Sequence, residues 1–281
     1  MTDSASAPLI AFIGGGNMAA SLIGGLLRGG HPAARIRVAE PLAERRDWLA
    51  QTYAVTTHTL GADAARDADA LVLAVKPQQM QEALAGLQVR AGAVVISIAA
   101  GVRLATLTQA LGGQIHPVRS MPNTPALLGK GITGLYAPPQ TPAAARALAE
   151  SLLSAAGPTV WVPAESDLDA VTALSGSGPA YYFLLTEALA EAGAQLGLDT
   201  DTARALARQT LIGAAAMAEQ TDADIHSLRV QVTSRGGTTE AAVTHLESAG
   251  LRTILADALR AACLRSQQLG ASLATPTAKD T

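Results

Sequence analysis

The stretch Leu9-Ile10-Ala11-Phe12-Ile13-Gly14-Gly15-Gly16-Asn17-Met18-Ala19 decides the fold of this 281-residue chain. A short apolar run ends in three glycines, and a helical pattern over 17–28 follows at once. The form Gly14-x-Gly16-x-x-Ala19 matches the turn that binds the pyrophosphate of a dinucleotide at the end of a β-strand. We therefore predict a dinucleotide cofactor here, bound by Ile13, Gly14, Gly15, Gly16, Asn17 and Met18.

Short apolar runs and helical patterns alternate through the first half of the chain. Alternation of this kind is typical of an α/β fold, and it predicts a Rossmann-type doubly wound parallel sheet. The carboxyl ends of its strands then meet at the edge where a cofactor binds. Further strands are expected at 35–39, 70–75, 94–98, 115–120, 131–136 and 159–162, and further helices at 42–51 and 141–156.

After about Pro163 the strand-like runs give way to long Ala/Leu-rich helices, which predict a C-terminal all-α domain. We assign residues 1–163 to the dinucleotide-binding domain and 164–281 to a helical dimerisation and substrate domain. The segment from Thr275 onward is expected to be disordered. The predicted helices of this half are 167–174, 179–196, 200–220 and 251–269, with another following Thr239.

The predicted helix 179–196 is apolar or small almost all round, a pattern typical of a helix that is buried on every side. In a domain of this size, part of that burial requires a second subunit. Charged residues make up only 15% of the chain, against the usual quarter. A low-charge surface also favours association, and we expect a homodimer that forms through the helical domain.

Composition excludes several classes of function. A net charge of −3 and an aromatic content of 3% give no basic or base-stacking surface, so we expect no nucleic-acid partner. No apolar stretch is long enough to cross a membrane, and no secretory signal is visible, so we expect a cytoplasmic protein without a membrane partner. Cys263 is the only cysteine, which excludes a cysteine-based metal cluster within one chain, and we expect no metal.

Charged residues after the second strand bear on the choice of cofactor. Glu40 lies 26 positions after Gly14, where an acid accepts hydrogen bonds from the ribose hydroxyls of NAD and repels a 2′-phosphate. Arg45 and Arg46 follow closely. Either of them could favour the 2′-phosphate of NADP, and the alternative is that both are solvated residues of a helix. NADPH and NADH both remain open as the cofactor.

Two further strand ends should face the cofactor. Small residues after the fourth of the predicted strands let a nicotinamide ring lie flat against the backbone. Lys76 follows the third strand, where it either contacts a cofactor hydroxyl or phosphate or is an ordinary surface lysine. The candidate cofactor residues at these ends are Ala74, Val75, Lys76 and Pro77, together with Ile98, Ala99 and Ala100.

Three more motifs carry polar or small residues. The loop 119–125 is polar and stiffened by two prolines, and the segment 174–181 joins two predicted helices. The turn 234–239 precedes a helix, so its N–H groups and the helix start suit a carboxylate. Thr239 offers a hydroxyl to a substrate nitrogen. The alternative for this turn is a capped helix start that binds no ligand.

Together the motifs GGGNMA, AVKP, SIAAG, MPNTP, LSGSGPAYYF and VTSRGGTTEAA resemble those of the pyrroline-5-carboxylate reductases. The resemblance runs in order from Leu9 to about Leu269, and its last motif is the most specific. Two positions depart from the family pattern. Arg235 stands where the family usually has proline, and Gly61 stands about where many members have an asparagine that contacts the adenosine.

The resemblance implies reduction of the C=N bond of 1-pyrroline-5-carboxylate with NADPH or NADH to give L-proline, the last step of proline biosynthesis. It implies that Thr239 is the catalytic residue, as the partner of the ring nitrogen. It also implies a dimer with interleaved helical domains, commonly assembled into a decamer. The substrate-binding residues it implies are Glu165, Ser234, Gly236, Gly237, Thr238 and Thr239.

Two other functions compete with this interpretation. A β-hydroxyacid dehydrogenase shares the two-domain plan, but it uses a lysine of the helical domain as general acid or base. No lysine occurs here between Lys130 and Lys279, which disfavours that chemistry. A dinucleotide-sensing regulator without catalysis needs only the first motif, and it leaves the turn 234–239 unexplained.

Overall fold

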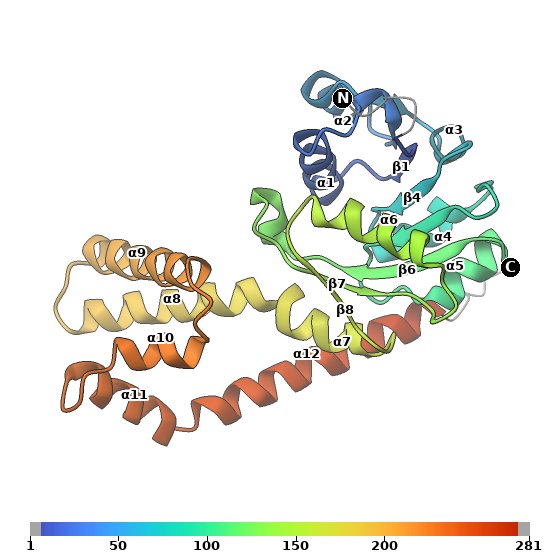
Figure 1. The fold of residues 1–281 in the computed structure, drawn as a ribbon. Coiled ribbons are helices and arrows are strands. Elements are labelled where there is room, and N and C mark those ends of the chain that lie inside the picture. Colours follow the sequence, from blue (N-terminus) through green and yellow to red (C-terminus); the bar gives the residue numbers. More distant parts are fainter. Residues whose placement is uncertain (1–6, 275–281) are drawn as a thin grey trace, which may run out of the picture. The chain divides into compact units, whose positions relative to one another are not determined.

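The computed structural model describes residues 7–274, which form two compact units (Figure 1). The first contains residues 7–177 together with 262–274, and the second contains residues 178–261. This division differs from the expected boundary at 163/164, because helix α7 (Asp167–Val171) packs on strands of the sheet and the end of helix α12 (Leu251–Ala274) returns to the first unit. The segment from Thr275, expected to be disordered, lies outside the described residues.

Eight strands of the first unit form one sheet in the order β3-β2-β1-β4-β5-β6-β7-β8. All neighbouring pairs are parallel except β6 and β7, so the expected doubly wound sheet is confirmed with one antiparallel step. Only a short 3-10 helix, η3 (Thr124–Leu128), joins β6 to β7, and a parallel return needs a longer crossover. The strands are β1 (Ile10–Ile13), β2 (Ile36–Ala39), β3 (Thr56–His58), β4 (Ala70–Leu73), β5 (Val94–Ser97), β6 (His116–Met121), β7 (Thr133–Tyr136) and β8 (Thr159–Trp161).

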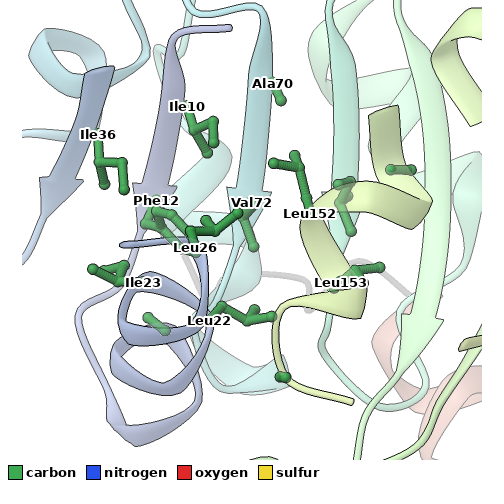
Figure 2. Packing of buried hydrophobic residues seen from close by; sticks show 14 of the residues in the cluster. Ile10, Phe12, Leu22, Ile23, Leu26, Ile36, Ala70, Val72, Leu152 and Leu153 are labelled. Carbon is green, nitrogen blue, oxygen red and sulfur yellow. The ribbon is translucent and has the colours of Figure 1, made fainter. Parts of the chain in front are cut away.

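Helices cover both faces of the sheet. One face packs on α1 (Asn17–Arg28), α2 (Ala43–Tyr53) and α6 (Ala143–Ser154), and the other on α3 (Gly61–Ala65), α4 (Met80–Leu84) and α5 (Leu104–Leu111). Alternate residues of β1 serve the two faces, with Ile10 and Phe12 on the side of α1 and α6 in Figure 2. Burial on both faces explains why the central strands β1 and β4 read as continuous apolar runs.

The strand register aligns the ends of β1 to β5 in one row with Arg119 of β6. Ile13 pairs with Ala39 and with Leu73, and the row continues on both sides to His58, Ser97 and Arg119. The segments that follow β1, β2, β4 and β5 therefore leave the sheet at the same edge. The strand order reverses between β1 and β4, and ligands of doubly wound sheets bind outside such a switch point.

The predicted helix 167–174 is α7 followed by one π-helical turn, η4 (Thr172–Gly176). Two short 3-10 helices, η1 (Ala33–Arg35) and η2 (Pro77–Gln79), complete the first unit. The Asn123 side chain donates to the carbonyl of Ser175 at 3.2 Å and accepts from the N–H of Ile132 at 3.0 Å. Residues 119–121 of the predicted loop 119–125 belong to β6, and the rest of it is tied through Asn123 to the π-helical turn. Such turns are frequent at functional sites.

The second unit contains α8 (Gly178–Gln195), α9 (Thr200–Glu219), α10 (Ile225–Gln231), α11 (Thr238–Ser248) and the start of α12. Helix α8 packs against α9. The sequence predicted that α8 is buried on every side, with part of that burial supplied by a second subunit. Within a single chain α8 stays partly exposed, because this unit has no further layer to cover it. Its exposed apolar side chains are Tyr182, Phe183, Leu184, Leu185 and Leu189.

Candidate active site

The glycine turn lies between the ends of β2 and β4. The N–H of Gly14 donates to the carbonyl of Ala39 at 2.8 Å, and the backbone φ of Gly14 is +97°. A Cβ at this position would lie 2.7 Å from the carbonyl oxygen of Ala74. Gly14 is therefore required both by its conformation and by the close approach of β4.

Glu40 supports the turn from the side of β2. One carboxylate oxygen accepts from the N–H of Gly15 at 2.9 Å, and the other accepts from the N–H of Leu42 at 3.0 Å. The residue is 9% exposed. The sequence assigned Glu40 to the ribose, whereas in the structure both of its oxygens already accept backbone N–H groups.

The first turn of α1 offers donors to an anion. Gly16 is the N-cap residue and has no side chain to cap the helix, and no acid lies in the first turn. A Cβ at Gly16 would meet no atom within 4 Å, although Gly14 and Gly15 are tightly enclosed. Open space in front of unpaired helix N–H groups fits the pyrophosphate of a dinucleotide, so the residues present suit the expected cofactor.

Arg45 lies against the same turn. Its Nε donates to the carbonyl of Gly15 at 2.7 Å, its Nη2 lies 3.5 Å from Oδ1 of Asn17, and its guanidinium stacks 4.1 Å from the ring centroid of Trp48. Arg46, by contrast, donates to the backbone carbonyls of Glu40 and Pro41. Only Arg45 of the two places its charge beside the glycine turn.

The remaining predicted cofactor residues lie at the same edge of the sheet. The N–H of Ala74 donates to the carbonyl of Ile13 at 2.8 Å, and the N–H of Ile98 donates to the carbonyl of Leu73 at 3.2 Å. Ala99 is buried, and its N–H donates to Oγ of Ser97. Lys76 is exposed and precedes η2, which begins at Pro77. Val75 and Ala100 are half-buried beside them.

A buried group of charges surrounds Arg119 of β6, next to this edge. Arg119 is 2% exposed, and its guanidinium lies 3.5 Å from Glu165 and 3.6 Å from Asp169. Arg103 reaches Asp169 at 2.8 Å. Burial, above all, and then the charge of Arg103 lower the pKa of Arg119, against the two carboxylates, which raise it. The two positive and two negative charges compensate one another.

Sequence reasoning missed the roles of Arg103, Arg119 and Asp169. One signal was present, because Arg119 places a permanent charge within the predicted strand 115–120. A charge inside a buried strand needs a partner, but its partners are distant in sequence. Only the fold brings them together.

Glu165, expected to contact the substrate, takes part in the same group. Its Oε1 accepts from the N–H of Leu104 at 2.9 Å, at the first residue of α5, and its side chain is 25% exposed. One oxygen of Glu165 therefore satisfies a helix start, which leaves the carboxylate only partly available for another ligand.

The turn predicted to bind substrate lies in the second unit and keeps its residues together. The N–H of Gly236 donates to the carboxylate of Glu240 at 2.6 Å, and the N–H of Gly237 donates to the carbonyl of Ser234 at 3.0 Å. Gly237 is the N-cap residue of α11 and provides no capping side chain. Thr238 and Thr239 are exposed on the first turn of that helix.

Comparison with known proteins identifies the family. The family model for pyrroline-5-carboxylate reductase dimerisation matches residues 165–269, and the model for NADP oxidoreductase, coenzyme F420-dependent, matches residues 9–101. A pyrroline-5-carboxylate reductase of Pseudomonas aeruginosa is 48% identical over 270 residues, which cover 95% of this chain and 99% of that protein. The chain belongs to the pyrroline-5-carboxylate reductase family.

Solved structures of other pyrroline-5-carboxylate reductases agree with this assignment. The Coxiella burnetii reductase superimposes with a TM-score of 0.86 at 41% identity and covers 94% of this chain and 99% of its own. The Plasmodium falciparum enzyme with NADP bound gives a TM-score of 0.77 at 26% identity, covering 94% and 98% of the two chains. In the part of the chain that the structure describes, no helix is long and apolar enough to cross a membrane.

Substitution of Gly16 tests whether the glycine turn of this reductase binds the cofactor. Gly16→Val places a side chain in the open space before α1, so we expect a folded enzyme whose KM for NADPH and NADH rises at least about tenfold. Gly113→Val is the matched control, since a Cβ at Gly113 also meets no atom within 4 Å but lies away from the turn. Steady-state kinetics measure the effect. An unchanged cofactor KM in folded Gly16→Val protein would contradict the assignment.

Proposed function

We propose that the protein reduces 1-pyrroline-5-carboxylate to L-proline, the final step of proline biosynthesis, with NAD(P)H at the turn 14–17 and the imine at the turn 234–239. The observation that carries the proposal is the coexistence of the two turns in a chain that matches the Pseudomonas aeruginosa reductase over 95% of its length. A generic dinucleotide-binding protein has no need of the second turn.

The first unit holds the cofactor. Gly14, Gly16 and the first N–H groups of α1 receive the phosphates, and Ala99 with Ala100 gives the nicotinamide a wall without bulky side chains. When bound, the dihydronicotinamide supplies a hydride to the carbon of the C=N bond. The protein contributes by holding the reacting atoms within contact distance and by excluding water.

The second unit provides an anchor for the substrate carboxylate. The N–H groups of the first turn of α11 are unpaired by the helix itself, and the positive end of its dipole favours an anion. The hydroxyls of Ser234 and Thr238 add donors. Glu240 must release the N–H of Gly236 for that group to join, and Arg235, in place of the usual proline, adds positive charge.

Thr239 is the partner of the ring nitrogen. Its hydroxyl both donates and accepts, so it can orient the imine and support delivery of the proton that the nitrogen gains during reduction. We assign Glu165 to the substrate as well. Because Oε1 of Glu165 is held by the N–H of Leu104, the assignment concerns its other oxygen.

The protein is a homo-oligomer, since residues 165–269 match a dimerisation domain, and we propose that its dimers assemble into a decamer in the cytoplasm. The apolar side chains that α8 exposes support the dimer, and the low charge content of the chain supports further association. Light scattering at micromolar concentration should give ten times the mass of the 28.5 kDa chain. A stable mass of two chains would reject the decamer and keep the dimer.

Arg45 and Glu40 should tune the choice between NADPH and NADH in opposite directions. Arg45→Ala removes the arginine charge that lies beside the turn, so the ratio of kcat/KM for NADPH over NADH should fall by roughly 10-fold or more. Glu40→Ser removes a negative charge, so the same ratio should rise, while KM for both cofactors increases because Gly15 loses its acceptor. Ratios that stay constant in both variants would show that neither charge reads the ribose.

Thr239→Ala tests the catalytic assignment. Loss of one hydrogen bond to the reacting nitrogen should lower kcat/KM for pyrroline-5-carboxylate roughly 10- to 1000-fold. Cofactor binding should barely change, since the phosphates lie on the other unit. Thr239→Ser restores the hydroxyl and should recover most of the activity.

Two comparisons separate this role from helix capping. Thr244→Ala, at an exposed position of the same helix, should retain activity and controls for the loss of a threonine from α11. If Thr239 only stabilises the start of α11, Thr239→Ala loses thermal stability and keeps its turnover. Near-wild-type turnover by Thr239→Ala would reject the catalytic role.

A further inference from the structure

The end of α12 belongs to the cofactor-binding unit, although the sequence assigned it to the helical domain. Residues 262–274 lie in the first unit, while the same continuous helix begins at Leu251 in the second. Ser266 and Gly270, one helical turn apart, are both buried. This end of α12 thus presents one packed face to the first unit.

Gly270 packs tightly against the turn after β5. A Cβ on Gly270 would lie 3.0 Å from the carbonyl oxygen of Gly101 and 3.5 Å from Nε of Arg103. Gly101 has a φ of +78°, and a Cβ there would lie 3.1 Å from the N of Gly270. Two glycines therefore permit contact between two backbones.

Ser266 connects the same helix end to the buried charges. Its hydroxyl donates to Oδ1 of Asp169 at 2.8 Å, while Oδ2 of Asp169 accepts from Arg103 at 2.8 Å. Arg119 lies between Asp169 and Glu165, and Glu165 accepts from the N–H of Leu104. Both ends of the segment 101–104 are consequently fixed, one by Gly270 and the other by the charged group.

We propose that residues 262–274 are a positioning element for the cofactor. They fix the turn 98–101, against which the nicotinamide lies, by means of the Gly101–Gly270 contact and the hydrogen bond from Ser266 to Asp169. The inference rests on the proposed cofactor site. Ser266 and Gly270 are positioning residues, because they act through Asp169 and Gly101. The backbone of the nicotinamide wall is then held in place before the cofactor arrives, which preorganises the site.

The test uses two variants and two measurements on the full-length protein. Gly270→Ala improves intrinsic helix propensity but places a methyl group against Gly101, and Ser266→Ala removes the buried hydrogen bond. Gln268→Ala, on the exposed side of the same helix end, is the matched control. Calorimetric titration gives the Kd of NADPH, and amide hydrogen exchange of the cofactor-free protein shows how firmly the backbone of the turn is held.

We expect both variants to raise the Kd of NADPH roughly 5- to 50-fold, with KM for pyrroline-5-carboxylate little changed. In the cofactor-free protein, the amides of Ile98, Ala99 and Leu104 should exchange faster, while those of Gly14 and Ala74 should not. Gln268→Ala should leave both measurements at their wild-type values.

Three results would overturn the proposal: unchanged exchange at 98–104, faster exchange with an unchanged Kd, or a lowered melting temperature with uniformly faster exchange. The last result would mean that the helix end stabilises the first unit as a whole and does not position the turn 98–101. Gly16→Val separates this test from the cofactor site itself. If the Kd of that variant is normal, the glycine turn is not the site, whereas a raised Kd for Gly16→Val with a normal Kd for Gly270→Ala and Ser266→Ala rejects the positioning role alone.

Discussion

The close approach of Gly14 to the end of β4 constrains the whole edge of the sheet at which we propose that the cofactor binds. The carbonyl of Ala74 lies where a side chain at Gly14 would be, so β1 and β4 can leave the sheet side by side only with glycine at this position. The same turn is fixed from β2 by the hydrogen bonds that Gly14 and Gly15 make to Ala39 and Glu40. With the turn fixed, α1 begins at Asn17 with its N–H groups facing open space, and an anion site results.

Much of this arrangement could be predicted from the sequence, because its determinants are local. The apolar run before Gly14, the spacing of the glycines and the helical pattern after them each specify one element, and α1 spans the expected residues Asn17–Arg28. The turn 234–239 was likewise predicted from a local pattern, its Ser, Gly and Thr residues before a helix. The antiparallel β7 was not predicted as antiparallel, since its direction depends on how short the connection through η3 is. Strand β3, Thr56–His58, is too short and too polar to stand out as an apolar run.

What the sequence could not give is the set of contacts between distant segments. Arg119 and Glu165 are 46 positions apart, and Asp169 and Ser266 are 97 apart, yet the four belong to one buried group. No local pattern pairs such residues. The role expected for Glu40 illustrates the same limit. An acid at the end of the second strand suggested a ribose ligand, but the fold also brings Gly15 and Leu42 within hydrogen-bond distance of its carboxylate.

These long-range contacts give the buried charged group a structural reason to lie beside the proposed cofactor site. An apolar core holds strands together but leaves turns free, since turns expose backbone N–H and C=O groups that an apolar side chain cannot bind. Glu165 and Asp169 instead bind Leu104 and Arg103 directionally at one end of the segment 101–104, and Arg119 compensates their charge inside the protein. Burial makes each of these bonds costly to break singly. The group therefore holds the turn after β5 in one conformation, which suits the role that we propose for it as the wall that supports the nicotinamide during hydride transfer.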